Sequence, residues 1–533
     1  MRVRWLGQVR YRDAHALQHG LFTEGRDDWL LLLQHPPTYT MGVRADPTHV
    51  LVDPVSVGAE LVTADRGGDV TFHGPGQLVG YPILSLPGKA GGRAGVKRGG
   101  GMADTVAYVR SVEQLLVDVL ADLGLGGAGR LDGYPGVWVD PGGLRPRKIA
   151  AIGVRLSRGR SMHGFALNVS TDLSWFDHIV PCGIPDLGVT SLAAEGIDVS
   201  MRDVVDAVAA RAEARWGGGA GERADTAWDR TVDHDQGVTG VPVELRARKP
   251  DWLRAPASMG PDYLRLKATM RELDLTTVCE EAGCPNIFDC WADGTATFML
   301  NGERCTRACG FCLVDTRRPL EPDPDEPGRV AEAVARMGLR FVVLTAVARD
   351  DLADGGASGF AATVAALRAR QPDVGVEVLI PDCKGDPDAL QVIFDARPDV
   401  VNHNLETVAR LQRTVRPSAS YARSLAVLAR ARAAGLATKS GLMVGLGETV
   451  DELEGALADL HGVGVASVTI GQYLRPSAAH LPVARWWTPD ELAHLKAVGE
   501  GFGIRHVEAS PLTRSSYHAA EVLRRDLLPE SAP

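Results

Sequence analysis

From Ala296 onward the chain alternates between short apolar segments and stretches of helical period. The apolar segments begin at Ala296, Phe341, Val374, Asp399, Lys439, Ala466 and Ile504. Amphipathic patterns, such as those from Gly359 and Val450, lie between most of them. Strands that alternate with helices form parallel βα units. We therefore expect an α/β fold in which this half is a full or partial TIM-like (β/α) barrel, with its chemistry on the loops after the strands.

Six of the eight cysteines lie between residues 279 and 312. Cys305, Cys309 and Cys312 are spaced C-x3-C-x2-C, and an earlier triplet is spaced C-x4-C-x5-C. A zinc ribbon requires two C-x2-C pairs, which together give four thiolates. Three thiolates instead leave one iron of a four-iron cluster without a cysteine. Spacing favours iron–sulfur clusters, with a structural zinc site completed by a histidine as the alternative for the earlier triplet.

The bulk composition limits the class of protein. Lys and Arg number 57 against 67 Asp and Glu, so the net charge is −10, which disfavours a general nucleic-acid surface. The first ten residues have no apolar core of the signal-peptide kind, and the apolar run Trp29–Leu33 is a buried strand rather than a membrane span, which needs about 20 residues. We expect a soluble protein of a reducing cytoplasm, without nucleic-acid or membrane partners.

A change of composition separates two halves. From about residue 215 the chain is rich in Gly and Asp, poor in aliphatics and without a helical or strand period. This pattern indicates a linker. We therefore expect a first domain over 1–215, a flexible linker over 216–245 and a second domain over 246–533.

The second domain resembles lipoyl synthase, a family of radical S-adenosylmethionine enzymes. The resemblance rests on both cysteine triplets together with RDDLADGG, NHNLETV, TKSGLMVGLGET, GQYLRPS and the terminal RSSYHA. It implies two 4Fe–4S clusters: Cys305, Cys309 and Cys312 hold the one that binds and cleaves S-adenosylmethionine. The auxiliary cluster, a sulfur donor, has as its implied ligands Cys279, Cys284, Cys290 and Ser516. Without the motif, Ser516 reads as a surface serine. The chain departs from the expected pattern at Ala348 and Cys383, neither of which is a ligand.

The first half contains RGGDVTFHGPGQ from Arg66, RKIAAIG from Arg147, HGFALN from His163 and PCG at Pro181. By local sequence alone, Cys182 reads as a buried small hydrophobe and Lys148 as a solvated charge. In this order, however, the four stretches resemble the lipoyl(octanoyl) transferases. That resemblance implies an α/β core akin to the biotin and lipoate ligases, with no bound nucleotide.

The same resemblance implies the site residues of the first half. Cys182 is the nucleophile, and Lys148 favours its thiolate and helps to deprotonate the acceptor amine. The implied acyl-site residues are Arg66, Gly67, Gly68, Asp69, Val70, Thr71, Phe72, His73, Ala151, Ile152, Gly153, Gly164, Phe165 and Ala166.

Together the two resemblances imply consecutive steps of lipoyl assembly. Octanoate passes from octanoyl-acyl carrier protein through a Cys182 thioester to a lysine of a lipoyl-accepting domain, and two sulfurs are then inserted at carbons six and eight. The implied partners are acyl carrier protein, the glycine cleavage H protein, the acyltransferases of 2-oxoacid dehydrogenases, and an electron donor such as ferredoxin or flavodoxin.

Three rival interpretations remain. In the first interpretation, the first half is an ATP-dependent lipoate ligase, because the two kinds of enzyme share a fold. In the second, the first half is a non-catalytic docking module for octanoylated domains. The second half is another sulfur-inserting radical enzyme, such as a biotin-synthase-like or tRNA-methylthiolating protein. The acidic balance and the RSSY terminus disfavour the tRNA option.

Overall fold

The structure is a computed structural model that describes residues 1–86, 104–181, 187–218, 221–228, 249–254, 261–275, 277 and 295–516. The chain divides into two compact units, Met1–Trp228 and Asp229–Pro533. Within the described ranges, no helix combines the length and the apolar character that a membrane crossing requires.

The first unit is built on a mixed nine-stranded sheet in the order β12-β1-β2-β6-β10-β9-β8-β7, with β11 paired to β9. The pairs of β1 with β2 and β12 and of β9 with β11 are parallel, and the other pairs are antiparallel. Its strands are β1 (Arg2–Gln8), β2 (Trp29–Gln34), β6 (Gln77–Ile83), β7 (Gly129–Leu131), β8 (Tyr134–Val139), β9 (Arg147–Ser157), β10 (Arg160–Asn168), β11 (Gly188–Val189) and β12 (Glu222–Asp225). A second sheet has the order β4-β3-β5, from β3 (Thr38–Met41), β4 (Glu60–Thr63) and β5 (Val70–His73).

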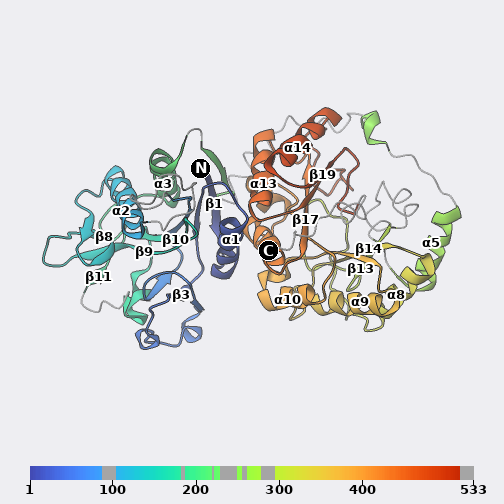
Figure 1. Cartoon of the computed structure of the whole chain (residues 1–533), viewed down its shortest axis with the longest axis horizontal. Coiled ribbons are helices and arrows are strands. Elements are labelled where there is room, and N and C mark those ends of the chain that lie inside the picture. The colour runs from blue at the N-terminus through green and yellow to red at the C-terminus, as the bar shows by residue number, and fades with distance from the viewer. Residues whose placement is uncertain are drawn as a thin grey trace, which may run out of the picture. The chain divides into compact units, whose positions relative to one another are not determined.

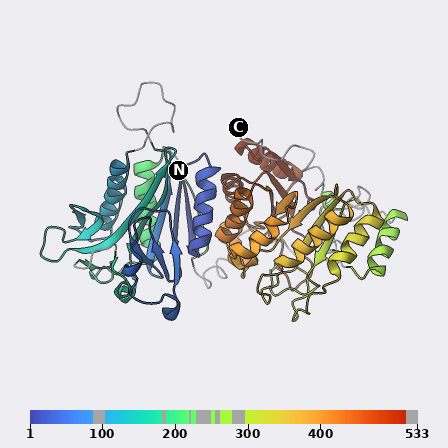
Figure 2. The ribbon, with the colours of Figure 1, turned by 60° about the horizontal axis from the view of Figure 1, so that its bottom comes forward.

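Helices cover both faces of the large sheet (Figure 2). Helix α1 (Tyr11–Thr23) packs on β6 and β10 from one side, while α2 (Thr105–Asp122) and α3 (Met201–Trp216) pack together on the other. The buried strand expected at Trp29–Leu33 is confirmed as β2, whose first five residues are buried. A sheet covered on both faces explains why β2 is a continuous apolar run rather than an alternating one.

The first unit continues beyond the boundary at 215 that composition suggested. Strand β12 pairs in parallel with β1, and the Trp228 ring stacks on the Trp5 ring at 4.3 Å between centroids. Because these contacts hold a polar segment at the edge of the sheet, residues 221–228 are part of the first unit rather than of a flexible linker. The rest of the expected linker, from residue 229 to 245, lies outside the described residues.

The second unit contains a seven-stranded parallel sheet in chain order, β13-β14-β15-β16-β17-β18-β19 (Figure 1). Its strands are β13 (Thr295–Leu300), β14 (Phe341–Ala346), β15 (Gly375–Leu379), β16 (Val400–Asn402), β17 (Ala437–Val444), β18 (Ser467–Gln472) and β19 (His506–Ala509). Each apolar segment predicted from the sequence is one of these strands. Since no pairing joins β19 to β13 in the described part of the chain, the sheet is a partial barrel, which confirms the expected fold class.

Helices run along the outside of this sheet (Figure 1). They are α8 (Glu326–Met337), α9 (Ala357–Arg370), α10 (Pro387–Asp395), α11 (Gln412–Val415), α12 (Tyr421–Ala433), α13 (Val450–Gly462) and α14 (Pro489–Phe502), with α5 (Pro261–Glu272) before β13. Capping boxes start α13 at Thr449 and α14 at Thr488. Such boxes fix where the loops end and the helices begin, and so hold the strand-end loops in place.

Candidate functional site

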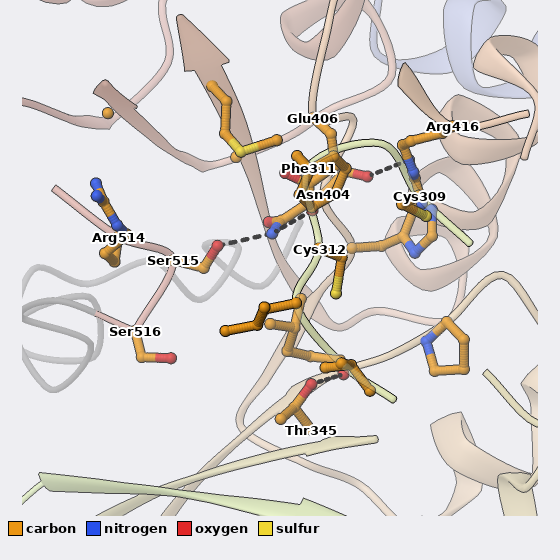
Figure 3. Close-up of a pocket in the computed structure, with 18 of the residues that line it drawn as sticks. Cys309, Phe311, Cys312, Thr345, Asn404, Glu406, Arg416, Arg514, Ser515 and Ser516 are labelled. Atoms are coloured by element: carbon orange, nitrogen blue, oxygen red, sulfur yellow. Dashed lines mark hydrogen bonds between the residues drawn. The ribbon is translucent and has the colours of Figure 1, made fainter. Parts of the chain in front are cut away.

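The second unit has a cavity of about 460 Å³ at the carboxyl ends of its strands (Figure 3). Residues from β13, β14, β15, β17 and β18 and from the loops after them line it. This volume lies in the usual range for small-molecule sites, and the position is the one at which barrel enzymes place their chemistry.

Cys305, Cys309 and Cys312 all line this cavity, on the loop that follows β13. Burial raises the pKa of the Cys309 thiol, and it raises the pKa of Cys312 to about 11. Metal ligands must be deprotonated, so these thiols will release their protons on binding iron. Three thiols gathered at one cavity fit one cluster with an open iron.

Hydrogen bonds fix the shape of the cysteine loop. The Cys305 amide donates to the Asp315 carbonyl at 2.8 Å, and the Gly310 amide donates to the Val415 carbonyl at 2.9 Å. The Arg307 amide donates to the Cys305 sulfur at 3.4 Å. A bond of this kind tunes the reduction potential of a cluster that the sulfur binds.

The Arg307 side chain holds the cysteine loop in place through ion pairs. Its guanidinium donates to both Asp350 oxygens at 2.7 and 2.8 Å and to Asp382 Oδ1 at 2.6 Å. Asp382 is wholly buried, and the guanidinium holds the pKa of this carboxyl well below its usual range despite burial. Because Arg307 lies between the first two cysteines, its ion pairs place the whole triplet.

Replacing Arg307 by methionine should lower the free energy of unfolding of the second unit by about 3–5 kcal/mol, because removing one partner leaves a buried charge poorly compensated. Loss of the visible absorbance of the cluster-loaded chain in urea measures this effect. Arg317→Met is the matched control: it breaks a pair with Asp315 in the same loop, but Arg317 is 75% exposed, so about 0–1 kcal/mol is expected. Equal losses of unfolding free energy in the two variants would contradict the role of Arg307 in holding the cysteine loop.

Two serines from the segment after β19 line the same cavity (Figure 3). Asn404, in the loop after β16, donates to Ser515 Oγ at 2.7 Å, and Ser516 follows at the cavity edge. Cys279, Cys284 and Cys290, the other implied ligands of the auxiliary cluster, lie outside the described residues. Their pairing with Ser516 therefore stays a prediction.

Glu406 and Arg416 are cavity residues to which the sequence alone gave no role, although NHNLETV contains the first of them. Burial raises the pKa of the Glu406 carboxyl. Asn404 donates to it at 3.1 Å, and Arg416 donates to the Asn404 carbonyl at 2.9 Å. The network sets a carboxyl, an amide and a guanidinium beside the cysteines, where a ligand with both amino and carboxylate groups finds partners.

The two departures from the family pattern have simple structural explanations. Ala348 acts through its backbone, because its carbonyl accepts from the Thr306 amide at 3.0 Å and from the Thr306 hydroxyl at 2.9 Å. Cys383 is buried, and burial raises its pKa to about 12. Such a thiol is inert at neutral pH, as the sequence suggested.

In the first unit, three of the implied acyl-site segments meet. Strands β9 and β10 pair Ala151 with Ala166, Ile152 with Phe165, and Gly153 with Gly164. A Cβ on Gly153 would lie 3.0 Å from the Gly67 carbonyl oxygen, and the Gly67 amide donates to the Val154 carbonyl at 3.1 Å. Glycine at 153 thus lets the segment that begins at Arg66 pack on β9.

The Arg66–His73 segment is held by contacts with β3 and with the loops around it. Arg66 Nη2 donates to the Thr40 carbonyl at 2.6 Å, so this guanidinium is committed to β3. Gly68 has φ of +95°, which glycine tolerates. Asp69 Oδ2 lies 2.6 Å from His49 Nδ1. Val70, Thr71, Phe72 and His73 form β5, and the Phe72 ring stacks on Trp175 at 5.1 Å between centroids.

A buried polar chain runs from His73 towards Lys148. His73 Nδ1 contacts Gln77 Oε1 at 2.8 Å, Gln77 donates to Asn168 at 3.0 Å, and Asn168 donates to the Thr190 carbonyl at 2.9 Å. The Thr190 amide then donates to the Lys148 carbonyl at 3.0 Å. Burial, together with the nearby His35, holds the pKa of His73 well below its usual value, so its ring stays neutral.

Lys148 is nearly buried on β9, rather than solvated as its local sequence alone suggested: it is 7% exposed, and its ammonium lies 4.8 Å from the centroid of the Trp138 ring. A cation over a tryptophan face is held in place by the ring quadrupole. Trp138 is a contact that the sequence gave no reason to single out. Cys182 lies outside the described residues, so its approach to Lys148 stays a prediction.

Comparison with known proteins gives each half a family. Residues 10–213 match the family described as the lipoyl protein ligase A/B catalytic domain. Residues 222–284 match the N-terminal domain of lipoyl synthase of the radical SAM family, and residues 301–460 match the radical SAM superfamily. The resemblance of the second half to lipoyl synthase is confirmed, and the first half is confirmed as a lipoate ligase/transferase-type catalytic domain.

Individual relatives match the second half over most of their own length. The lipoyl synthase of Mycolicibacterium smegmatis is 53% identical over 282 residues, covering 53% of this chain and 89% of that protein. The lipoyl synthase of Rubrobacter xylanophilus is 56% identical over 278 residues, 52% of this chain and 87% of that protein. A solved structure of a bi-partite lipoate protein ligase from Thermoplasma acidophilum is 19% identical, covers 42% of this chain and 86% of that chain, and has a TM-score of 0.34.

Proposed function

We propose that this chain, which belongs to the lipoyl synthase family, builds the lipoyl group in two successive steps on one polypeptide. The family uses S-adenosylmethionine and 4Fe–4S clusters. The first unit, a lipoate ligase/transferase-type catalytic domain, attaches octanoate to a lysine of a lipoyl-accepting protein. The second unit then replaces two C–H bonds of that chain by C–S bonds.

One observation carries the proposal for the second unit: the cavity at the strand ends gathers three cluster-type cysteines with polar partners for a small molecule. When bound there, the cluster supplies the electron that cleaves S-adenosylmethionine. Arg307 holds the cysteine loop in position through Asp350 and Asp382. The predominantly apolar wall, which includes Met299, Leu379 and Met443, keeps water away from reactive carbon centres.

In the first unit, the Cys182 thiolate attacks the carbonyl carbon of the octanoyl thioester on acyl carrier protein, and the carrier thiol leaves. The acceptor lysine then attacks the new thioester, and the Cys182 sulfur leaves. Lys148, held over Trp138, favours the thiolate by its positive charge and gives its proton to the departing carrier thiolate. The neutral amine of Lys148 then accepts the proton that the attacking acceptor amine loses. Placement of Lys148 on β9, beside the three converging acyl-site segments, supports this assignment.

The choice of octanoyl donor separates a transferase from a ligase. The full chain should octanoylate a lipoyl-accepting domain when given octanoyl-acyl carrier protein alone. Free octanoate with ATP and Mg²⁺ should give no product above background, because the proposed Cys182 route begins from an activated thioester and contains no step that activates a free acid. Mass spectrometry of the acceptor domain measures both reactions. Product from ATP and free acid alone would favour the ligase, and product from neither would favour a docking module.

The proposed partners follow from this chemistry. The first step needs octanoyl-acyl carrier protein and a lipoyl-accepting domain such as the glycine cleavage H protein or the acyltransferases of 2-oxoacid dehydrogenases. The second needs a one-electron donor such as ferredoxin or flavodoxin. All of these, and the reduced thiols of both sites, suit the cytoplasm.

A further inference from the structure

Four side chains that the proposed reactions do not use gather beside the acyl site of the first unit. His15 and His19 are one turn apart on α1, Asp65 lies between β4 and β5, and His163 lies on β10. His15 Nε2 is 3.1 Å from Asp65 Oδ1, His19 Nε2 is 3.6 Å from Asp65 Oδ2, and His163 Nε2 is 2.7 Å from Asp65 Oδ1.

The spacing of these atoms suits a single metal ion. One ligand atom each from His15, His19 and Asp65 lies within 4.8 Å of the other two. Ligand atoms held about 2.0–2.1 Å from a tetrahedral zinc ion lie about 3.3 Å apart. The distances from His15 Nε2 to Asp65 Oδ1 (3.1 Å) and from His19 Nε2 to Asp65 Oδ2 (3.6 Å) lie on either side of that separation, so the two imidazoles face the two oxygens of one carboxylate. Histidines at i and i+4 on one helix face are, moreover, a common way to present two zinc ligands.

Burial and charge also suit an ion. The side chains of His15, His19 and Asp65 are 31%, 42% and 31% exposed, so an ion can enter from solvent. His163 is buried at 1% exposure, and its bond to Asp65 orients the carboxylate. Asp65 is the acidic member of the three, so its carboxylate supplies negative charge to a bound cation.

Arg155 is the one competitor for the carboxylate among the described contacts, because it pairs with Asp65 Oδ2. Its side chain is 42% exposed, so it can turn to solvent when an ion takes its place. The backbone of His163 is better fixed: its amide donates to Gln18 of α1 at 3.0 Å, and its φ is +57°. A non-glycine residue held in this region signals a local constraint.

We propose that His15, His19 and Asp65 bind one Zn²⁺ or a similar borderline divalent transition ion, with His163 as the support for Asp65. Imidazole and carboxylate are suitable ligands for this class of ion. The fourth position is left for water. Since Asp65 directly precedes Arg66, the ion ties α1 to the start of the glycine segment that packs on β9.

The test uses the full chain with its iron–sulfur clusters loaded, so that the cysteines of the second unit are already occupied. After equilibrium dialysis against Zn²⁺, the wild-type chain should retain one more zinc than His19→Gln. The zinc K-edge spectrum of that ion should show nitrogen and oxygen ligands at about 2.0–2.1 Å and no sulfur. His494→Gln is the matched control, because His494 pairs with Glu454 in the second unit; it should bind as much zinc as the wild type.

A thermal scan gives a second readout. At a hundredfold excess of Zn²⁺ over its Kd, the first unit of the wild type should melt about 5–10 °C higher than without the ion. His19→Gln and a second variant, His15→Gln, should show no such shift. Equal zinc retention in wild type and both variants, or sulfur-only coordination at the edge, would show that the cluster is an ion-pair network without a metal.

Discussion

A Cys182→Ser chain should form no octanoyl adduct with octanoyl-acyl carrier protein, and transfer to the acceptor domain should fall by about three orders of magnitude or more. A thiolate forms readily near neutral pH, whereas a serine hydroxyl without a dedicated base does not. The wild-type adduct should be released by hydroxylamine, as a thioester is. Mass spectrometry of the intact chain measures the adduct. Transfer by the serine variant at the wild-type rate would overturn the nucleophile assignment.

Two substitutions at Lys148 separate its two proposed tasks. Lys148→Ala should slow transfer by about a hundredfold, because loss of a proton-transfer group typically costs at least that much. Lys148→Arg keeps the positive charge and the contact with the Trp138 ring. The arginine side chain stays protonated, however, and therefore cannot accept the proton of the acceptor amine. The arginine variant should therefore still form the Cys182 adduct and fail at delivery to the amine. If both variants lose both steps equally, Lys148 serves only to hold the fold.

Much of the fold could be predicted from the local pattern of apolar and polar residues. Each strand of the second unit is a short apolar run flanked by helical periods, and each predicted run is a strand. The boundary after α3 was misplaced for a physical reason. Strand β12 is polar and belongs to the sheet through its backbone bonds to β1, and a backbone ladder leaves little mark on composition.

The sites were partly predictable. Spacing singled out Cys305, Cys309 and Cys312, which line the cavity of the second unit. The resemblance to the transferases singled out Lys148, whose role stays a prediction. Contacts between residues that are far apart in the chain produce no recognisable sequence pattern. Arg307 meets Asp382 across 75 residues, and Lys148 meets Trp138 only because β8 and β9 are neighbours. The cluster of His15, His19, Asp65 and His163 likewise depends on tertiary structure, since α1 lies across β10.

The largest effect in the second unit should follow loss of one cysteine of the C-x3-C-x2-C triplet. Cys309→Ala should reduce cleavage of S-adenosylmethionine to the level of cluster-free protein, because two thiolates cannot hold the cluster at the cavity. Iron should fall from about eight to about four atoms per chain, the remainder belonging to the auxiliary cluster. Cys284→Ala should also lose about four irons, yet it should retain reductive cleavage while inserting no sulfur.

Cys383→Ala is the matched control for both variants, since Cys383 lies near the same strand ends but is buried with a raised pKa. It should keep all of its iron and both activities. Chromatography of 5′-deoxyadenosine and of the lipoyl product, after anaerobic assay with a chemical reductant, separates cleavage from sulfur insertion. If both variants lose the same cluster, with cleavage of S-adenosylmethionine abolished in Cys284→Ala as well as in Cys309→Ala, the two triplets do not bind separate clusters. One zinc per chain in place of iron would remove the radical mechanism altogether and leave only the acyl-transfer step.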